Sequence, residues 1–222
     1  CRVWEMDAAG ILHAFAGNGT CDTSAAIGDG GPATSAWFRY PHSIAFNSGG
    51  VAFISEWLGQ RVRRLATDGM VSTYAGNGVR GFAGDGGPAT SASFNLPGGL
   101  AVAGDGTLYV GDAENGRFRS ISPSGTIDTF YSGYPGPRDI AVASDGAILL
   151  TGHQGTVLRC TGGGTSTIAG IGSPVCPPTG DGGPATAAGL CYPEKIAIDS
   201  AGGILLAEQD PRVRRFAIGG NI

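Results

Sequence analysis

A nine-residue motif occurs five times in this chain and constrains its fold more than any other feature. Its copies are RVWEMDAAG at 2–10, RVRRLATDG at 61–69, RFRSISPSG at 117–125, TVLRCTGGG at 156–164 and RVRRFAIGG at 212–220. A second element lies between them, as SIAFNSGGVAFISE at 43–56, LAVAGDGTLYVGD at 100–112, IAVASDGAILLTG at 140–152 and IAIDSAGGILLAE at 196–208. Self-similarity at fixed spacing predicts an array of small repeated units.

Each copy of the second element consists of two short runs with alternating apolar residues around a glycine-containing turn, which indicates a β-hairpin. The unit therefore contains strands a and b of that hairpin, strand c in the first motif, and strand d in segments such as MVSTYAG. Four antiparallel strands in about 40 to 56 residues are typical of a propeller blade. Ile44 and Phe46 share a face of one strand, as do Leu100 and Val102, and such faces become buried between blades. The sequence predicts an all-β propeller.

The composition supports turn-rich β structure, because the chain has 41 glycines, 13 prolines and only 14% charged residues. The net charge of −4 gives no general attraction to phosphate backbones, so we expect no nucleic-acid partner. No run approaches the roughly 20 apolar residues that cross a bilayer, so we expect no membrane insertion.

Three of the four links between strand d and the next strand a are long, and each carries AGNG or AGIG followed by GDGGPAT. With these motifs in register, the chain resembles the NHL-repeat β-propeller family. The resemblance implies one propeller domain over residues 1–222, with repeat boundaries near 60/61, 116/117, 155/156 and 211/212. Such propellers commonly have six blades, whereas about four to five are represented here. We therefore expect the propeller to be incomplete or to be closed by other chain segments.

The GDGGPAT motifs place Asp29, Asp85 and Asp181 in glycine-rich loops. A calcium loop would need alternating oxygen ligands, and that spacing is absent. We instead expect a structural role, in which the aspartate caps a tight turn, the glycines adopt positive φ and the proline starts one helical turn.

Two basic clusters lie in predicted strands c, and acidic residues close the preceding strands b. The clusters are Arg61, Arg63 and Arg64, and Arg212, Arg214 and Arg215, and the acidic residues are Glu56, Asp112 and Glu208. Because alternate residues of a strand point to opposite faces, Arg61 and Arg63 cannot share a face with Arg64. We therefore expect ion pairs within a blade instead of a surface that binds phosphates or acidic sugars.

The three histidines, His13, His42 and His153, occupy different blade positions, so we expect that they do not converge on a metal. Gly98, Arg138 and Glu194 occupy the position of His42 in the other repeats, which predicts a mixed polar rim. Nucleophile elbows, phosphate loops and paired CxxC sites are absent from the sequence. We therefore predict no catalytic residue, no metal site and no cofactor.

The cysteines indicate the cellular compartment. Cys176 and Cys191 bracket one long link and form the favoured disulfide pair, and Cys1 with Cys21 is a second candidate pair. Cys160 replaces an apolar residue of the sister repeats, so we expect a buried thiol. Disulfides in loops indicate an oxidising compartment, and Asn18 heads a glycosylation sequon.

These features together predict a non-catalytic structural or interaction module, extracellular or at the cell surface. Its partners would be proteins, either further copies that assemble into a fibre or other domains of a longer chain. The resemblance leaves two alternatives open, because some members of the family are metal-dependent lyases or hydrolases and others are RNA- or peptide-binding platforms.

Overall fold

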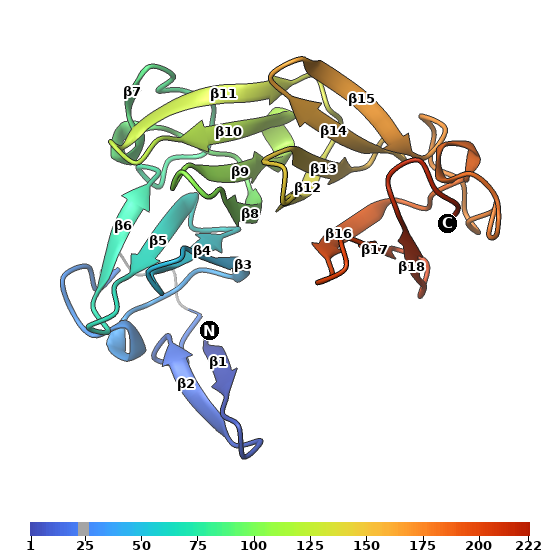
Figure 1. The fold of residues 1–222 in the computed structure, drawn as a ribbon. Coiled ribbons are helices and arrows are strands. Elements are labelled where there is room, and N and C mark those ends of the chain that lie inside the picture. Colours follow the sequence, from blue (N-terminus) through green and yellow to red (C-terminus); the bar gives the residue numbers. More distant parts are fainter. Residues whose placement is uncertain (22–26) are drawn as a thin grey trace.

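A computed structural model describes residues 1–21 and 27–222 of the chain, and within them the fold is all-β with a few short 3₁₀ turns (Figure 1). The first pair of strands is β1 (Val3–Met6) with β2 (Leu12–Ala16). The next sheet contains β3 (Pro41–Phe46), β4 (Ala52–Glu56), β5 (Arg61–Leu65) and β6 (Val71–Ala75). The third contains β8 (Pro97–Val102), β9 (Leu108–Asp112), β10 (Arg117–Ile121) and β11 (Thr126–Ser132), with the short β7 (Gly87–Pro88) added beside β11.

Two further sheets complete the described chain. One contains β12 (Pro137–Val142), β13 (Ile148–Gly152), β14 (Val157–Thr161) and β15 (Gly164–Ala169), and the other contains β16 (Pro193–Ile198), β17 (Ile204–Glu208) and β18 (Val213–Phe216). The four larger sheets are arranged as the blades of a β-propeller, with β1–β2 and β16–β18 at the two ends of the series (Figure 1). The predicted all-β propeller fold is therefore confirmed.

Each blade is an antiparallel meander because its turns carry the residues that such turns need. In the β3–β4 turn, the Asn47 Oδ1 atom accepts hydrogen bonds from the backbone N–H groups of Gly49 and Val51, and Gly50 has a φ of 79°. A side-chain acceptor of this kind closes the turn locally, and glycine supplies the positive φ without steric cost. This turn fixes the register in which β3 pairs with β4 inside the blade.

The hydrophobic core lies between the blades. One cluster joins Phe53 and Val62 of the β3–β6 blade to Phe94, Leu100 and Leu108 of the next blade, and all five are buried. A second cluster joins the β12–β15 blade to the β16–β18 blade in the same way. Each blade therefore depends on its neighbours to cover its apolar face.

The three long links each contain one 3₁₀ turn directly after the proline of GDGGPAT. These turns are η1 (Ala33–Ser35), η2 (Ala89–Ser91) and η4 (Ala185–Ala187), and a further turn, η3 (Ala113–Asn115), follows β9. Ala33, Ala89 and Ala185 are buried, so each turn anchors its link to the blade edge. In the described part of the chain, no helix has both the length and the apolar character needed to cross a bilayer.

Candidate functional site

A buried arginine holds each long link against its blade. In the β3–β6 blade, the fully buried Arg63 lies 2.5 Å from an Asp29 oxygen and 3.5 Å from a Glu56 oxygen. Its guanidinium also donates hydrogen bonds to the carbonyls of Trp37 and Ile27. We call this arrangement of one strand-c arginine, one GDGG aspartate and one strand-b carboxylate the latch.

The latch occurs in all three blades that are preceded by a long link. Its other members are Arg119 with Asp85 and Asp112, and Arg214 with Asp181 and Glu208. The distances in these two latches agree closely with those of the Arg63 latch. In each, the arginine lies 2.6 Å from the aspartate of the link and 3.4–3.5 Å from the strand-b carboxylate. The latch is therefore a repeated device and not a single ion pair.

The strand-b carboxylate also binds the far end of the link. Glu56 accepts a hydrogen bond from the Arg39 backbone N–H at 2.6 Å, and Asp112 accepts one from Asn95 at 2.7 Å. Burial raises the pKa of Glu56, and it raises the pKa of Asp112 to about 6. The arginine opposes this effect, because its positive charge stabilises the ionised carboxylate. Each latch thus clamps both ends of a long link to one blade.

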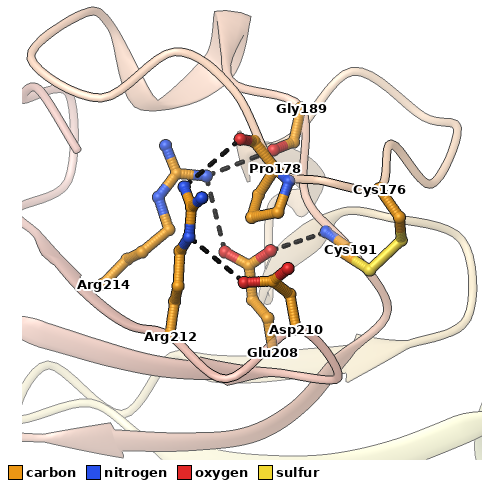
Figure 2. The surroundings of a disulfide bond; sticks show 8 residues. All are labelled: Cys176, Pro178, Gly189, Cys191, Glu208, Asp210, Arg212 and Arg214. Carbon is orange, nitrogen blue, oxygen red and sulfur yellow. Dashed lines mark hydrogen bonds and ion pairs between the residues drawn. A yellow bond between two sulfur atoms is a disulfide. The ribbon is translucent and has the colours of Figure 1, made fainter.

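In the last blade a disulfide reinforces the latch. Figure 2 shows the Cys176–Cys191 bond beside Glu208 and Arg214, and the backbone N–H of Cys191 donates to Glu208 at 2.6 Å. Figure 2 also shows Arg212, which forms an ion pair with Asp210 at 3.1 Å. A second disulfide joins Cys1 to Cys21, and Cys160 is free and buried. These are the two pairs and the buried thiol that the sequence led us to expect.

The β12–β15 blade, which follows the short link, has no latch. Leu158 stands where the other blades carry the latch arginine, and Gly152 stands where they carry the strand-b carboxylate. The buried Tyr134 comes from the short link, and its hydroxyl donates to the Thr156 carbonyl at 2.7 Å. This blade therefore replaces a charged cluster with an uncharged one.

A second cluster lies where the inner strands begin. His42 stacks on Trp57 at 4.7 Å between ring centres, and the Arg138 guanidinium lies 5.7 Å from the Trp57 ring. Arg138 also donates to the His153 Nε2 atom at 2.8 Å and lies 3.6 Å from Glu194. The predicted mixed polar rim thus forms a network that connects residues from several blades.

Two of the three histidines take part in the rim network. His42 and His153 belong to one network through Trp57 and Arg138, whereas His13 binds Asp7 at 2.9 Å. Burial, with the nearby Lys195 and Arg138, lowers the pKa of His42 to about 4. Across residues 1–21 and 27–222, no three His, Cys, Asp or Glu side chains are grouped so that they could hold a metal ion.

The β3 strand exposes its apolar side chains more than the equivalent strands of the other blades do. Ile44 is 39% exposed and Phe46 is 54% exposed, whereas the residues equivalent to Ile44 are 4–7% exposed. These equivalents are Leu100, Ile140 and Ile196. Trp4 of β1, the strand at the start of the series, is 52% exposed as well. We call Trp4, Ile44, Phe46 and the free edge of β1 the N-terminal blade surface.

The opposite end of the series has a smaller exposed apolar area. Val213 of β18 is 71% exposed, although its equivalents Val62, Phe118 and Val157 are fully buried. In the described structure β18 pairs with β17 on one side alone, so its other edge offers unpaired backbone groups. Within the described residues, both ends of the series therefore expose apolar side chains and a strand edge.

One sequence-based role requires correction, because the GDGG aspartates do not cap the turns that follow them. No side chain caps η1, η2 or η4, and Asp29, Asp85 and Asp181 pair with latch arginines instead. The positive φ of the following glycine does occur, at 78° for Gly30 and 77° for Gly86. The expected pairing of strand-c arginines with strand-b carboxylates is present.

Sequence reasoning missed Arg119, Trp57 and Tyr134. A signal for Arg119 was available, because every repeat after a long link has arginine at the third position of the nine-residue motif, and the repeat after the short link has Leu158 there. Asn18 remains a glycosylation candidate. Its Oδ1 atom accepts hydrogen bonds from the backbone and the hydroxyl of Thr20, both at 2.9 Å.

Comparison with known proteins gives local sequence matches and a broader structural match. No family model matches the chain. Teneurin-m of Drosophila melanogaster is 34% identical over 116 residues, which cover 47% of this chain and 4% of that protein. Teneurin-3 of Danio rerio is 32% identical over 137 residues, which cover 54% of this chain and 5% of that protein. The chain therefore spans a small fraction of these relatives.

Among solved structures, virginiamycin B lyase from Staphylococcus aureus has a TM-score of 0.57 at 13% identity, with 97% of this chain and 62% of that one covered. Aldose sugar dehydrogenase from Streptomyces coelicolor has a TM-score of 0.54 at 17% identity, with 90% and 64% covered. A protein of unknown function from Bacteroides thetaiotaomicron has a TM-score of 0.63 at 18% identity, with 79% and 46% covered. At these identities the similarity shows that the β-propeller fold is shared. It carries no information about activity.

Proposed function

We propose that this chain is a non-catalytic, NHL-type interaction module of an extracellular protein, and that it binds protein partners through the blade surfaces at its two ends. The exposure of Ile44 and Phe46 carries the proposal, because wherever a blade precedes them the residues equivalent to Ile44 are buried and those equivalent to Phe46 are half-buried. Burying one large apolar side chain contributes about 1.5–3 kcal/mol, so covering both is strongly favourable.

The free strand edges support the same proposal. β1 pairs with β2 and β18 pairs with β17, and within the described residues neither has a strand on its other side. Unpaired backbone donors and acceptors at a strand edge favour pairing with further β structure. The two ends differ in sequence and shape, so contact between copies is head-to-tail and gives a ring or a filament.

The disulfides support the extracellular part of the proposal. Cys176–Cys191 lies within one long link, and Cys1–Cys21 joins the start of the chain to another. Structural disulfides form and persist in oxidising compartments. The local similarity to teneurins is consistent with a repeat module inside a much larger protein.

Light scattering over a range of protein concentrations tests the association. We expect the mass to rise with concentration, and we expect Phe46→Lys to abolish the rise. Val79→Lys is the matched control, because Val79 is 61% exposed but lies in a link away from the N-terminal blade surface. A monomer at every concentration would overturn self-association, and stoichiometric zinc or calcium that supports turnover would overturn the non-catalytic assignment.

A further inference from the structure

We infer that the edge of β1 and the exposed face of β3 form an acceptor site for a β-hairpin whose second strand ends in a small uncharged residue. The inference rests on the proposed association through the N-terminal blade surface and specifies its partner. The hairpin is of the same type as β12–β13, which follows the short link and belongs to the blade without a latch.

The position of β1 in the repeat defines what the site accepts. β1 and β2 correspond to strands c and d of a blade, because Val3 aligns with Val62 in the nine-residue motif. In the complete blades, strand c pairs with strand b on its other side, as β5 does with β4 and β14 does with β13. An incoming strand b would therefore continue the sheet at the free edge of β1.

Strand a of the same hairpin would cover β3. Inner strands of successive blades pack against one another, as β3 does with β8, β8 with β12 and β12 with β16. A strand a placed before β3 buries Ile44 and Phe46 in the way that β3 itself helps to bury Leu100. One hairpin would therefore pair with the free edge of β1 and cover the exposed face of β3. Its strand a would continue the packing of inner strands that occurs three times between the described blades.

The third residue of the nine-residue motif, which lies in strand c, determines which type of hairpin fits. Where that residue is arginine, strand b ends in a carboxylate, and where it is Leu158, strand b ends in Gly152. In β1 this residue is Trp4, which carries no charge. Arg2 does not replace the missing arginine, because it donates to the Asn18 carbonyl as Arg61 does to that of Asn77.

A carboxylate delivered to this site would be buried without its arginine. The existing strand-b carboxylates show the burial that it would meet, because Glu56 is 1% exposed and Asp112 is fully buried. Burying an unpaired charge is strongly unfavourable. A second copy therefore does not fill this site by exchanging its β16–β17 hairpin, which ends in Glu208 and would lose Arg214 as its partner. Head-to-tail contact between the intact ends of two copies needs no such exchange.

The chain itself supplies a suitable probe, the β12–β13 hairpin. We would append a second copy of residues 137–154 directly before Cys1. The spacing from the appended Gly152 to Val3 then equals that from Gly152 to Val157 in the native blade. We expect a higher Tm, slower hydrogen exchange at β1, and protection of Phe46 from solvent.

Changing the appended Gly152 to Asp gives the matched control. We expect this variant to lose about a hundredfold in its folding equilibrium constant relative to the unchanged extension, because the new carboxylate is buried without a partner. Adding Trp4→Arg to it should restore most of the loss, whereas Trp4→Leu, which copies Leu158, should not.

The outcomes separate this inference from the proposed function. Equal stabilisation by both extensions, with no effect of Trp4→Arg, would overturn the selectivity and leave association at this surface intact. If neither extension slows exchange at β1 or protects Phe46, the acceptor site is overturned. The concentration dependence of the mass still decides the proposed function in that case.

Discussion

Tyr134 packs so closely against Gly152 that a Cβ atom at position 152 would lie 2.5 Å from the Tyr134 Cε1 atom. In the other blades the equivalent position carries a buried carboxylate that needs a latch arginine. Burial raises the pKa of the Tyr134 hydroxyl to about 12, so this residue stays neutral at physiological pH. The short link, Tyr134, Gly152 and Leu158 therefore form one uncharged alternative to the latch.

Leu158→Arg tests this alternative. The arginine would enter a blade that has neither a strand-b carboxylate nor a GDGG aspartate, so its buried charge would lack a partner. We expect a loss of about 3–5 kcal/mol in the free energy of unfolding, measured by urea denaturation. Leu158→Met keeps the volume and should cost less than about 1.5 kcal/mol. Similar stabilities for the two variants would contradict the finding.

Arg63→Leu tests the latch from the opposite direction. It leaves Glu56 buried without its counter-charge and frees the Asp29 loop, so we expect about 3–5 kcal/mol of destabilisation. Arg64→Leu is the control on the next residue of the same strand, and it should change stability by less than about 1 kcal/mol. Hydrogen exchange should show faster opening of residues 27–39 in Arg63→Leu alone.

The disulfides predict a specific cysteine chemistry. Non-reducing peptide mapping should recover Cys176 linked to Cys191 and Cys1 linked to Cys21. Replacing Cys176 and Cys191 with serine should cost about 3 kcal/mol, because the bond closes a loop of 15 residues. Cys160 should react with alkylating reagents only after unfolding, because burial hides its thiol and raises its pKa. Labelling of Cys160 in the native state would contradict this assignment.

The rim network predicts an acid transition. The pKa of His42 is lowered from its ordinary value of 6.5 to about 4, so the unfolded chain binds its proton more tightly than the folded chain. The stabilisation from neutral His42 is therefore complete above pH 6.5 and is lost as the pH falls towards 4. NMR titration should give this pKa directly. Lys195→Gln and Arg138→Gln should each raise it, because both remove a nearby positive charge.

Asn18 predicts a glycan when the chain passes through a eukaryotic secretory pathway. Asn18→Gln should abolish the mass shift that glycosidase treatment causes. Val79→Thr creates a sequon at the equivalent Asn77, whose Nδ2 atom donates to the carbonyl of Ser91 and the hydroxyl of Ser93. Because this amide is already engaged, we expect lower occupancy at Asn77 than at Asn18. An unmodified Asn18 on secreted protein would contradict the prediction.

Repetition explains how much of the fold was predictable from sequence. Alternating apolar residues such as Ile44 and Phe46, and the glycine turns between them, identify the hairpins, and five copies of one motif identify the array. The pairing of strand-c arginines with strand-b carboxylates was also predictable, because both occur at fixed positions within a repeat. The fold class therefore follows from local sequence patterns that recur in every repeat.

The rest depends on contacts between residues far apart in sequence. Asp29 lies 34 residues from Arg63, so nothing local in GDGGPAT distinguishes a turn cap from an ion-pair partner. The network of His42, Trp57 and Arg138 joins different blades, and its formation depends on Gly98, where a side chain would approach Trp57 to 3.3 Å. Such contacts follow from how blades stack and not from the pattern within one blade.

The latch also defines which part of each link is free to vary. It fixes the link near its GDGG aspartate and again just before strand a, so the segment between the AGNG-type motif and that aspartate carries no latch residue. These segments already differ in length, at 20–28, 79–84 and 173–180. Each segment also holds fixed points, because Cys21 and Cys176 form disulfides and the carbonyls of Ile27, Ala83 and Thr179 accept hydrogen bonds from the latch arginines. A foreign peptide that replaces only the residues between these fixed points would leave the clamped ends unchanged. The three sites make this chain a scaffold for displaying several variable loops on a constant frame.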